Sequence, residues 1–138
     1  MMTDSYSFWE SAVAFVVAFV AAGLFTIAFK VIYQAATPYN ERTLIREGNV
    51  AAAITLGAAL LGYVLPLASA LTHTVSLLEF AVWALLAGVI QIVAFTIVRM
   101  IVMRDFSDRI VRGELAAAIY MASISLGVGL LNAACMSA

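Results

Sequence analysis

The sequence predicts an all-α membrane protein with four transmembrane helices. Of its 138 residues, 65% are hydrophobic and only 11% carry a charge. A soluble domain of this size covers its surface with polar groups, and this chain has too few of them. Its apolar residues gather in four long stretches, each suited to cross a bilayer as a helix. The stretches do not alternate polar and apolar residues, which argues against a membrane β-barrel.

Each apolar stretch is long enough for one crossing, which takes about 20 residues. The first runs from about Phe8 to Tyr33, and the second from about Asn49 to Leu71. The third runs from about Leu77 to Met103, and the fourth from about Leu115 to Met136. We do not expect the first stretch to be a cleaved signal peptide, because acidic rather than basic residues precede its apolar run.

The connections after the first and third stretches resemble short helices lying on the membrane surface. In the first connection, Thr37 is the predicted N-cap, Pro38 the first helical residue, and Gly48 the end of the helix. In the connection after the third stretch, Ser107 is the predicted N-cap and Gly113 the predicted end of the helix.

The charged residues of these connections have two interpretations. The mixed charges between Glu41 and Glu47 form either a solvated face beside anionic headgroups or a surface that docks a cytoplasmic partner. The candidate docking residues are Pro38, Asn40, Glu41, Arg42 and Arg109.

The basic residues predict which side of the membrane each connection faces. All seven occur around the first and third connections. They are Lys30, Arg42, Arg46, Arg99, Arg104, Arg109 and Arg112. By the positive-inside rule these connections are cytoplasmic, and both termini and the turn between the second and third stretches lie outside.

The chain also repeats itself. The pattern of glycines and alanines from Gly48 to Gly62 recurs 65 residues later, from Gly113 to Gly127. The first and third stretches match at a spacing of 69 residues, which pairs Glu10 with Glu79. Two consistent spacings that include charge and glycine indicate a duplication.

The predicted repeat unit is a two-helix hairpin, residues 1–72 and then 73–138. A hairpin crosses the membrane an even number of times, so both copies enter it with the same polarity. We therefore expect a four-helix bundle whose pseudo-two-fold axis lies along the membrane normal, rather than an inverted repeat.

Small residues predict which helices touch. Gly57 and Gly62 in the second stretch, and Ser123 and Gly127 in the fourth, let membrane helices approach closely. We expect these two helices to form the centre, with the aromatic-rich first and third helices more exposed to lipid. The alternative role for the glycines is as hinges or a pore constriction.

Two pairs of polar residues occupy matching positions in the two copies. Glu10 and Glu79 lie at the outer ends of the first and third helices, and Asn49 and Glu114 begin the second and fourth. The first pair marks a membrane interface or the mouth of a cation path. The second pair caps helix N-termini or forms a polar pair near the pseudo-axis.

The chain offers little chemistry for catalysis. It has one His and one Cys, with no zinc, phosphate-loop or serine-elbow motif. We therefore expect neither an enzyme nor a bound cofactor. The net charge of -1 and the lack of a basic face argue against nucleic acid as a partner.

Four motifs are similar to those of a known family. They are Thr37-Pro38-Tyr39-Asn40-Glu41, then Leu44-Ile45, then Leu61-Gly62-Tyr63-Val64-Leu65-Pro66-Leu67 with Ser69-Ala70, and finally Asn132-Ala133-Ala134-Cys135-Met136. On these residues the chain resembles the YjfL family of small bacterial inner-membrane proteins, which carry a domain of unknown function. The resemblance spans almost the whole chain. It implies a bacterial inner-membrane location and a context of membrane-stress proteins, and it assigns no catalytic or ligand-binding residue.

We expect an integral inner-membrane protein of structural or adaptor type, linked to membrane maintenance or stress, whose cytoplasmic connections dock a partner. The expected partners are the lipid bilayer, further copies of the chain and a cytoplasmic membrane-stress protein. The alternative is a small channel or transporter for ions or small solutes. It would work as an oligomer, because four helices rarely enclose a path.

Overall fold

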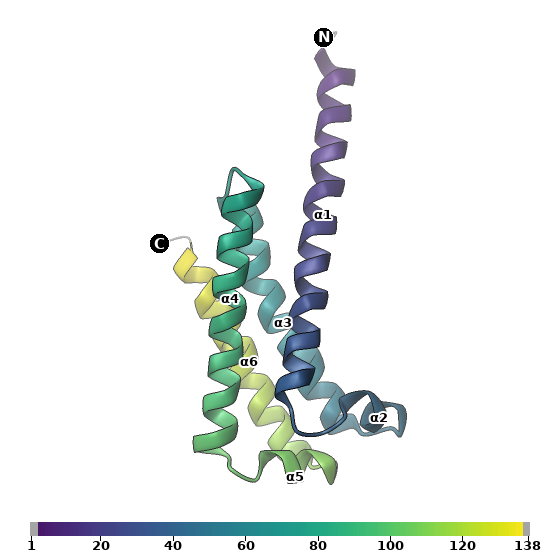
Figure 1. The fold of residues 1–138 in the computed structure, drawn as a ribbon, viewed down its shortest axis with the longest axis vertical. Helices are drawn as coiled ribbons and strands as arrows, with labels where there is room; N and C mark the ends of the chain where they lie inside the picture. The colour runs from purple at the N-terminus through teal and green to yellow at the C-terminus, as the bar shows by residue number, and fades with distance from the viewer. Residues whose placement is uncertain (1–2, 137–138) are drawn as a thin grey trace.

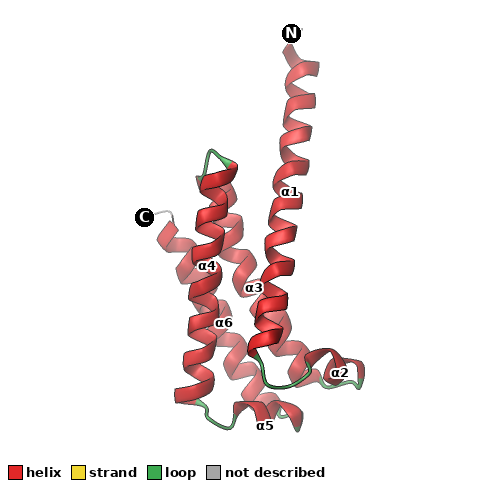
Figure 2. Cartoon of the chain, in the orientation of Figure 1, coloured by secondary structure: helices red, strands yellow, loops and turns green. Residues whose placement is uncertain are grey.

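The computed structural model describes residues 3–136, and these residues form helices with no strand among them. The helices in chain order are α1 (Thr3–Ala36), α2 (Glu41–Arg46), α3 (Val50–His73), α4 (Leu77–Ile97), the π-helical turn η1 (Val98–Val102), α5 (Phe106–Val111) and α6 (Leu115–Met136). Figure 2 shows how short the connections between them are.

Four of these helices are long and apolar enough to cross a membrane, which confirms the predicted helical class and its four spans. They are α1, α3, α4 continued by η1, and α6. In Figure 1 the short helices α2 and α5 lie at one end of the bundle. The turn between α3 and α4 lies at the other end, toward which the beginning of α1 and the end of α6 also point.

Helix α3 lies at the centre of the bundle. It packs along α6, and it also contacts α4 and the later part of α1. The α3–α6 contact is closest at two glycines: a Cβ on Gly62 would lie 2.5 Å from the Ser125 carbonyl oxygen, and a Cβ on Gly129 would collide with the Gly62 backbone. Only glycine allows the two backbones to come this close.

The small residues predicted for this contact are only partly in it. Gly62 lies in the close approach, but a Cβ on Gly57 or Gly127 would meet no atom within 4 Å. Ser123 is exposed, and its hydroxyl donates to the Ile119 carbonyl of its own helix. The face of α6 that packs on α3 contains Ser125 and Gly129 instead. A shift of two residues turns a helical position through about 200°, which accounts for the wrong prediction at Ser123 and Gly127.

Within the described residues, four side chains of the long helices hydrogen-bond to carbonyl oxygens of neighbouring long helices. Tyr63 Oη donates to Ala84 O at 2.9 Å, Gln91 Nε2 to Ser125 O at 3.3 Å, Asn132 Nδ2 to Ala87 O at 3.3 Å, and Ser69 Oγ to Ala133 O at 3.0 Å. Such bonds fix the helices against one another where hydrophobic attraction between helices is weak.

Both surface helices end at the predicted glycine, but neither begins at the predicted N-cap residue. Gly48 and Gly113 follow α2 and α5 with φ of 88° and 77°, as predicted. The N-cap of α2 is Asn40, whose Oδ1 accepts from Thr43 N at 3.2 Å, and not Thr37, whose hydroxyl donates to a carbonyl of the last turn of α1. Pro38 therefore precedes the helix. The N-cap of α5 is Asp105 and not Ser107.

The hairpins match locally but pack differently. The Gly48 and Gly113 amides donate to Ile45 O and Ile110 O, at 3.0 and 2.9 Å, so positions 65 residues apart make the same bond. In the bundle, however, α4 contacts both α3 and α6, whereas α1 contacts α3 and α4 and makes little contact with α6.

Candidate functional site

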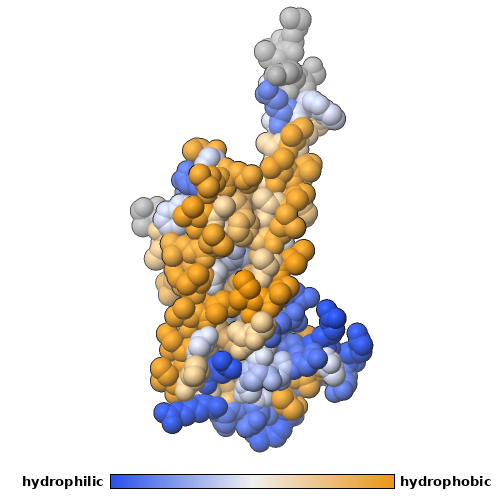
Figure 3. All heavy atoms as spheres, in the orientation of Figure 1, coloured by the Kyte–Doolittle hydropathy of each residue, from blue (hydrophilic) through white to orange (hydrophobic). Residues whose placement is uncertain are grey.

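The polar residues of the chain gather at the end of the bundle that carries α2 and α5. Figure 3 shows a hydrophilic band there, below an almost continuous apolar surface over the long helices. The predicted docking residues all lie on or beside these two short helices, so this end is the candidate functional site.

A groove of about 400 Å³ lies between the two matching helix connections. One wall is formed by Glu47, Gly48, Asn49 and Val50, with Leu44 beside them. The other is formed by Val111, Arg112, Gly113 and Leu115. Equivalent segments of the two hairpins therefore face each other across the groove.

Asn49 ties the two connections together. Its Oδ1 accepts from Ala52 N at 3.0 Å, which caps α3 as predicted. Its Nδ2 donates to Ile110 O at 2.8 Å and to Val111 O at 3.3 Å, at the end of α5. The two Nδ2 bonds join Asn49 to residues that follow it by 61 and 62 positions in the chain. The N-cap pattern in the sequence does not predict these bonds.

Glu114 occupies the matching position but acts differently. It accepts hydrogen bonds from Arg109 Nε at 3.0 Å and Nη2 at 2.6 Å, and Arg112 Nη2 lies 3.5 Å from its other oxygen. The bond from Arg109 holds the pKa of Glu114 below its usual value, and the pKa of Arg109 is raised in return. Arg109, predicted as a docking residue, is therefore occupied by an ion pair within its own connection.

Glu41 is not on the solvated face that the charge pattern suggested. Its side chain is buried, with 2% of the residue exposed, and neither carboxylate oxygen has a hydrogen-bond partner in the described part of the chain. It is the first residue of α2, on the side of the helix that faces the bundle. Burial raises its pKa to about 7, while the Thr37 hydroxyl and the Lys30 charge act in the opposite direction.

Tyr33, Tyr39 and Arg99 surround the same buried region. The two tyrosine hydroxyls and the Arg99 Nε are buried without a hydrogen-bond partner within residues 3–136. Burial, and then the Glu41 carboxylate, raise the pKa of Tyr39 well above its usual range. This cluster was not predicted from the sequence, because Tyr33 has the pattern of the last apolar residue of a span. The available signal was a second tyrosine, Tyr39, six residues after Tyr33 at the start of the connection.

The remaining candidates are exposed. Pro38, Asn40 and Arg42 lie at the surface of the α2 connection. Glu10 and Glu79 are exposed in the first third of α1 and the first turn of α4, and neither forms an ion pair within the described residues. They therefore do not build a binding site in a single copy of the chain.

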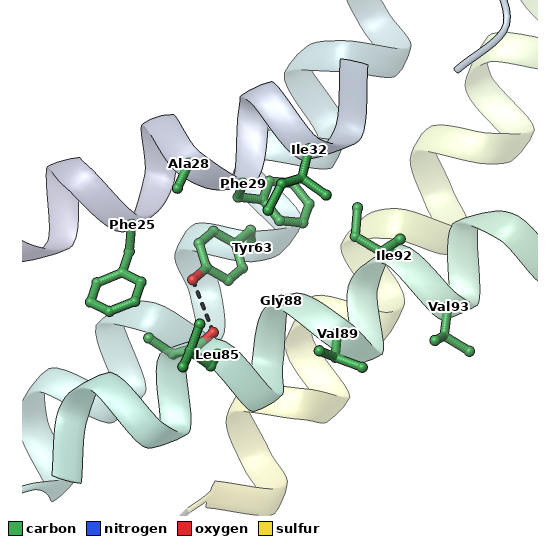
Figure 4. A pocket seen from close by; sticks show the side chains of 11 residues that line it. Phe25, Ala28, Phe29, Ile32, Tyr63, Leu85, Gly88, Val89, Ile92 and Val93 are labelled. Carbon is green, nitrogen blue, oxygen red and sulfur yellow. Dashed lines mark hydrogen bonds between the residues drawn. The ribbon is translucent and has the colours of Figure 1, made fainter. Parts of the chain in front are cut away.

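A second cavity, of about 250 Å³, lies between α1 and α4 at membrane depth. Figure 4 shows the Tyr63 ring between these helices, with Phe29 on one side and Gly88 on the other. The Tyr63 hydroxyl is already bonded to Ala84 O. The crevice therefore offers hydrocarbon packing and no free polar group to hold a polar solute.

The family model for a domain of unknown function, DUF350, matches residues 7–136. The chain belongs to the DUF350 family. It is 38% identical over 128 residues to the UPF0719 inner membrane protein YjfL of Escherichia coli strain K12. That alignment covers 93% of this chain and 96% of the relative, and the protein of strain O157:H7 is equally similar. No solved structure matches the chain significantly.

Membership of the DUF350 family confirms the YjfL-like resemblance of the sequence motifs. Together with the four apolar helices, it establishes a multi-pass inner-membrane protein. The family description assigns no activity.

Proposed function

We propose that this DUF350 protein is a membrane adaptor that docks a cytoplasmic protein in the groove between its two helix connections. The observation that carries the proposal is the groove itself, of about 400 Å³, lined by charged and apolar residues of both connections. Glu47 and Arg112 stand at its sides with exposed charges, and Val50 and Leu115 supply apolar surface. A partner segment with an apolar edge and mixed charge fits this lining.

The proposal includes an orientation in the membrane. All seven basic residues lie near the α2 and α5 end, so we propose that this end is cytoplasmic and that both termini are outside. We further propose that the hairpins 1–72 and 73–138 arose by duplication. The matching glycine conformations at Gly48 and Gly113 support this.

The groove is held in shape by side chains rather than by partner contacts. Asn49 joins the end of α5 to the start of α3, and the Arg109–Glu114 pair braces α5 against α6. A preformed surface loses less entropy when a partner binds. We propose that the partner is a membrane-stress protein, as the family context implies.

Site-specific photocrosslinking in cells tests the adaptor role. A photoreactive residue is placed at Glu47 or at Arg112, and the matched control carries it at Val75, which is 98% exposed at the opposite end. We expect both groove positions to trap the same discrete protein, identified by mass spectrometry, and Val75 to trap none. If the groove positions yield only lipid or self adducts, the adaptor proposal fails.

The second candidate is an oligomeric channel or transporter. It is favoured by the exposed apolar length of α1, where Phe8, Phe15 and Phe19 are each about 70% exposed and would be available to further copies. Reconstituted protein that shows no flux of ions or polyamines would eliminate this candidate. Flux that disappears when α1 is altered at these aromatic residues would support it.

A further inference from the structure

A pocket of about 390 Å³ opens between α1, α2 and α3. Its lining is Lys30 and Gln34 from α1, Arg42, Ile45 and Arg46 from α2, and Leu56 from α3. Three of the seven basic residues of the chain thus line one pocket. We propose that this pocket binds the phosphate group of an anionic phospholipid.

The basic residues are arranged to converge. Lys30 and Gln34 are four residues apart in α1, and Arg42 and Arg46 are four residues apart in α2, so each pair shares one helix face. The guanidinium groups of Arg42 and Arg46 and the ammonium of Lys30 supply N–H donors and no acceptor. The Gln34 amide adds a further N–H donor. Arginine binds phosphate in a bidentate manner, which suits a lipid headgroup.

These cations have no ion-pair partner. Within residues 3–136, the ion pairs join Arg109 and Arg112 to Asp105 and Glu114, all in the other connection. The two carboxyl groups nearest in sequence are the buried Glu41 and the exposed Glu47, and neither lies within 4.0 Å of a basic nitrogen. No ion pair within residues 3–136 therefore neutralises the cations of the pocket, and the buried Glu41 interacts with Lys30 only at longer range.

The second hairpin lacks the two α2 arginines that line this pocket. The positions 65 residues after Arg42 and Arg46 are Ser107 and Val111, which carry no charge. Two arginines of that connection, Arg109 and Arg112, are paired with Glu114 at 2.6 and 3.5 Å. This pair of arginines is thus particular to the first hairpin.

The position of the pocket favours a lipid over a free anion. Lys30 and Leu56 each lie six residues inside the end of their helix, about 9 Å at a rise of 1.5 Å per residue. Ile45 and Leu56 make part of the lining apolar, and the exposed Ile27 follows on the same side of α1. A phosphate bound here lies at headgroup depth with hydrocarbon directly above it.

Native mass spectrometry of the full-length protein in detergent tests the proposal. Phosphatidylglycerol is titrated against phosphatidylcholine, which carries a phosphate but no net charge. The variants are Arg42→Gln with Arg46→Gln and, as the matched control, Arg104→Gln with Arg112→Gln, which removes two exposed arginines from the other connection. Circular dichroism checks that each variant retains its helices.

We expect one phosphatidylglycerol to bind in preference to phosphatidylcholine. Loss of Arg42 and Arg46 should weaken it at least about tenfold, and loss of Arg104 and Arg112 less than about threefold. Replacing Arg42 and Arg46 by lysine should restore most of the binding. If the glutamine pair does not fold, Lys30→Gln replaces it, with the same expected direction.

Three results would overturn the proposal. Equal weakening in the two double variants would mean that general surface charge attracts the lipid. No preference for phosphatidylglycerol would remove the anionic lipid as ligand. Displacement of the lipid by millimolar inorganic phosphate would assign the pocket to a soluble anion instead. None of these outcomes depends on partner docking, so the adaptor proposal is tested separately.

Discussion

At the scale of single residues, the chain places its few charged groups in very different surroundings. Glu41 is buried without a hydrogen-bond partner, Glu114 is held by two arginines, and Glu47 is exposed. The three residues are chemically the same acid, yet burial raises the pKa of one, and hydrogen bonding to arginine lowers that of another. The raised pKa of Glu41, about 7, places the change of its charge near neutral pH.

Glu41→Gln tests this assignment through the pH dependence of stability. The folded protein retains a proton on Glu41 up to about pH 7, while the unfolded chain releases it near pH 4.5. Stability contributed by the protonated form is therefore present at low pH and is lost as pH rises through this window, by at most about 3 kcal/mol. We expect Glu41→Gln to be more stable than the natural protein at pH 8 and close to it at pH 5.

The measurement is the unfolding temperature in detergent micelles at the two pH values. Glu47→Gln is the matched control, because it removes an exposed acid six residues away, and it should change stability by less than about 0.5 kcal/mol at either pH. Parallel pH profiles for Glu41→Gln and the natural protein would contradict a titrating Glu41.

At the scale of elements, the contact between α3 and α6 organises the bundle. Its closest point is the Gly62–Gly129 crossing, near which Gln91 Nε2 donates to Ser125 O. Helix association in lipid depends on such close packing and on hydrogen bonds between helices. The contact should therefore be sensitive to a single added methyl group.

Gly129→Ala should destabilise the protein by about 1–3 kcal/mol, because its Cβ would collide with the Gly62 backbone. Gly127→Ala is the control on the same helix. Its Cβ meets no atom within 4 Å, so the change in stability should be within about 1 kcal/mol. Unfolding in detergent compares the two variants, and equal losses of stability would show that the crossing is not close in the membrane.

At the scale of the whole molecule, the protein has an apolar part that contains the long helices and a hydrophilic part at one end. The long helices present an apolar surface, and the hydrophilic band covers the end with α2 and α5 (Figure 3). Two functions are proposed for this end: a partner groove and a basic pocket. The docking of a cytoplasmic protein requires that this end faces the cytoplasm.

Cysteine labelling tests this orientation. Cysteine is introduced at Val75 or at Glu47 in a variant in which Cys135 is replaced by serine, and intact spheroplasts are treated with a membrane-impermeant maleimide. We expect Val75→Cys to react directly and Glu47→Cys to react only after permeabilisation, because the positive-inside rule places Glu47 in the cytoplasm. The reverse pattern would invert the topology.

The helical membrane class, the four spans and the glycine ends of the surface helices could all be predicted from the sequence. These follow from local properties: an apolar run of about 20 residues crosses a bilayer, and glycine readily adopts the positive φ seen at Gly48 and Gly113. The cap at Asn49 was also predictable, because a cap is a contact within one turn.

The buried face of each helix, in contrast, depends on how the helices pack against one another. The rotation of α6 placed Gly129 rather than Gly127 against α3, and the position of α2 under the bundle buried Glu41 rather than exposing it. Both outcomes depend on contacts between residues far apart in the chain. In so apolar a sequence, hydrophobic periodicity does not distinguish a helix face that meets lipid from one that meets protein, because both are apolar.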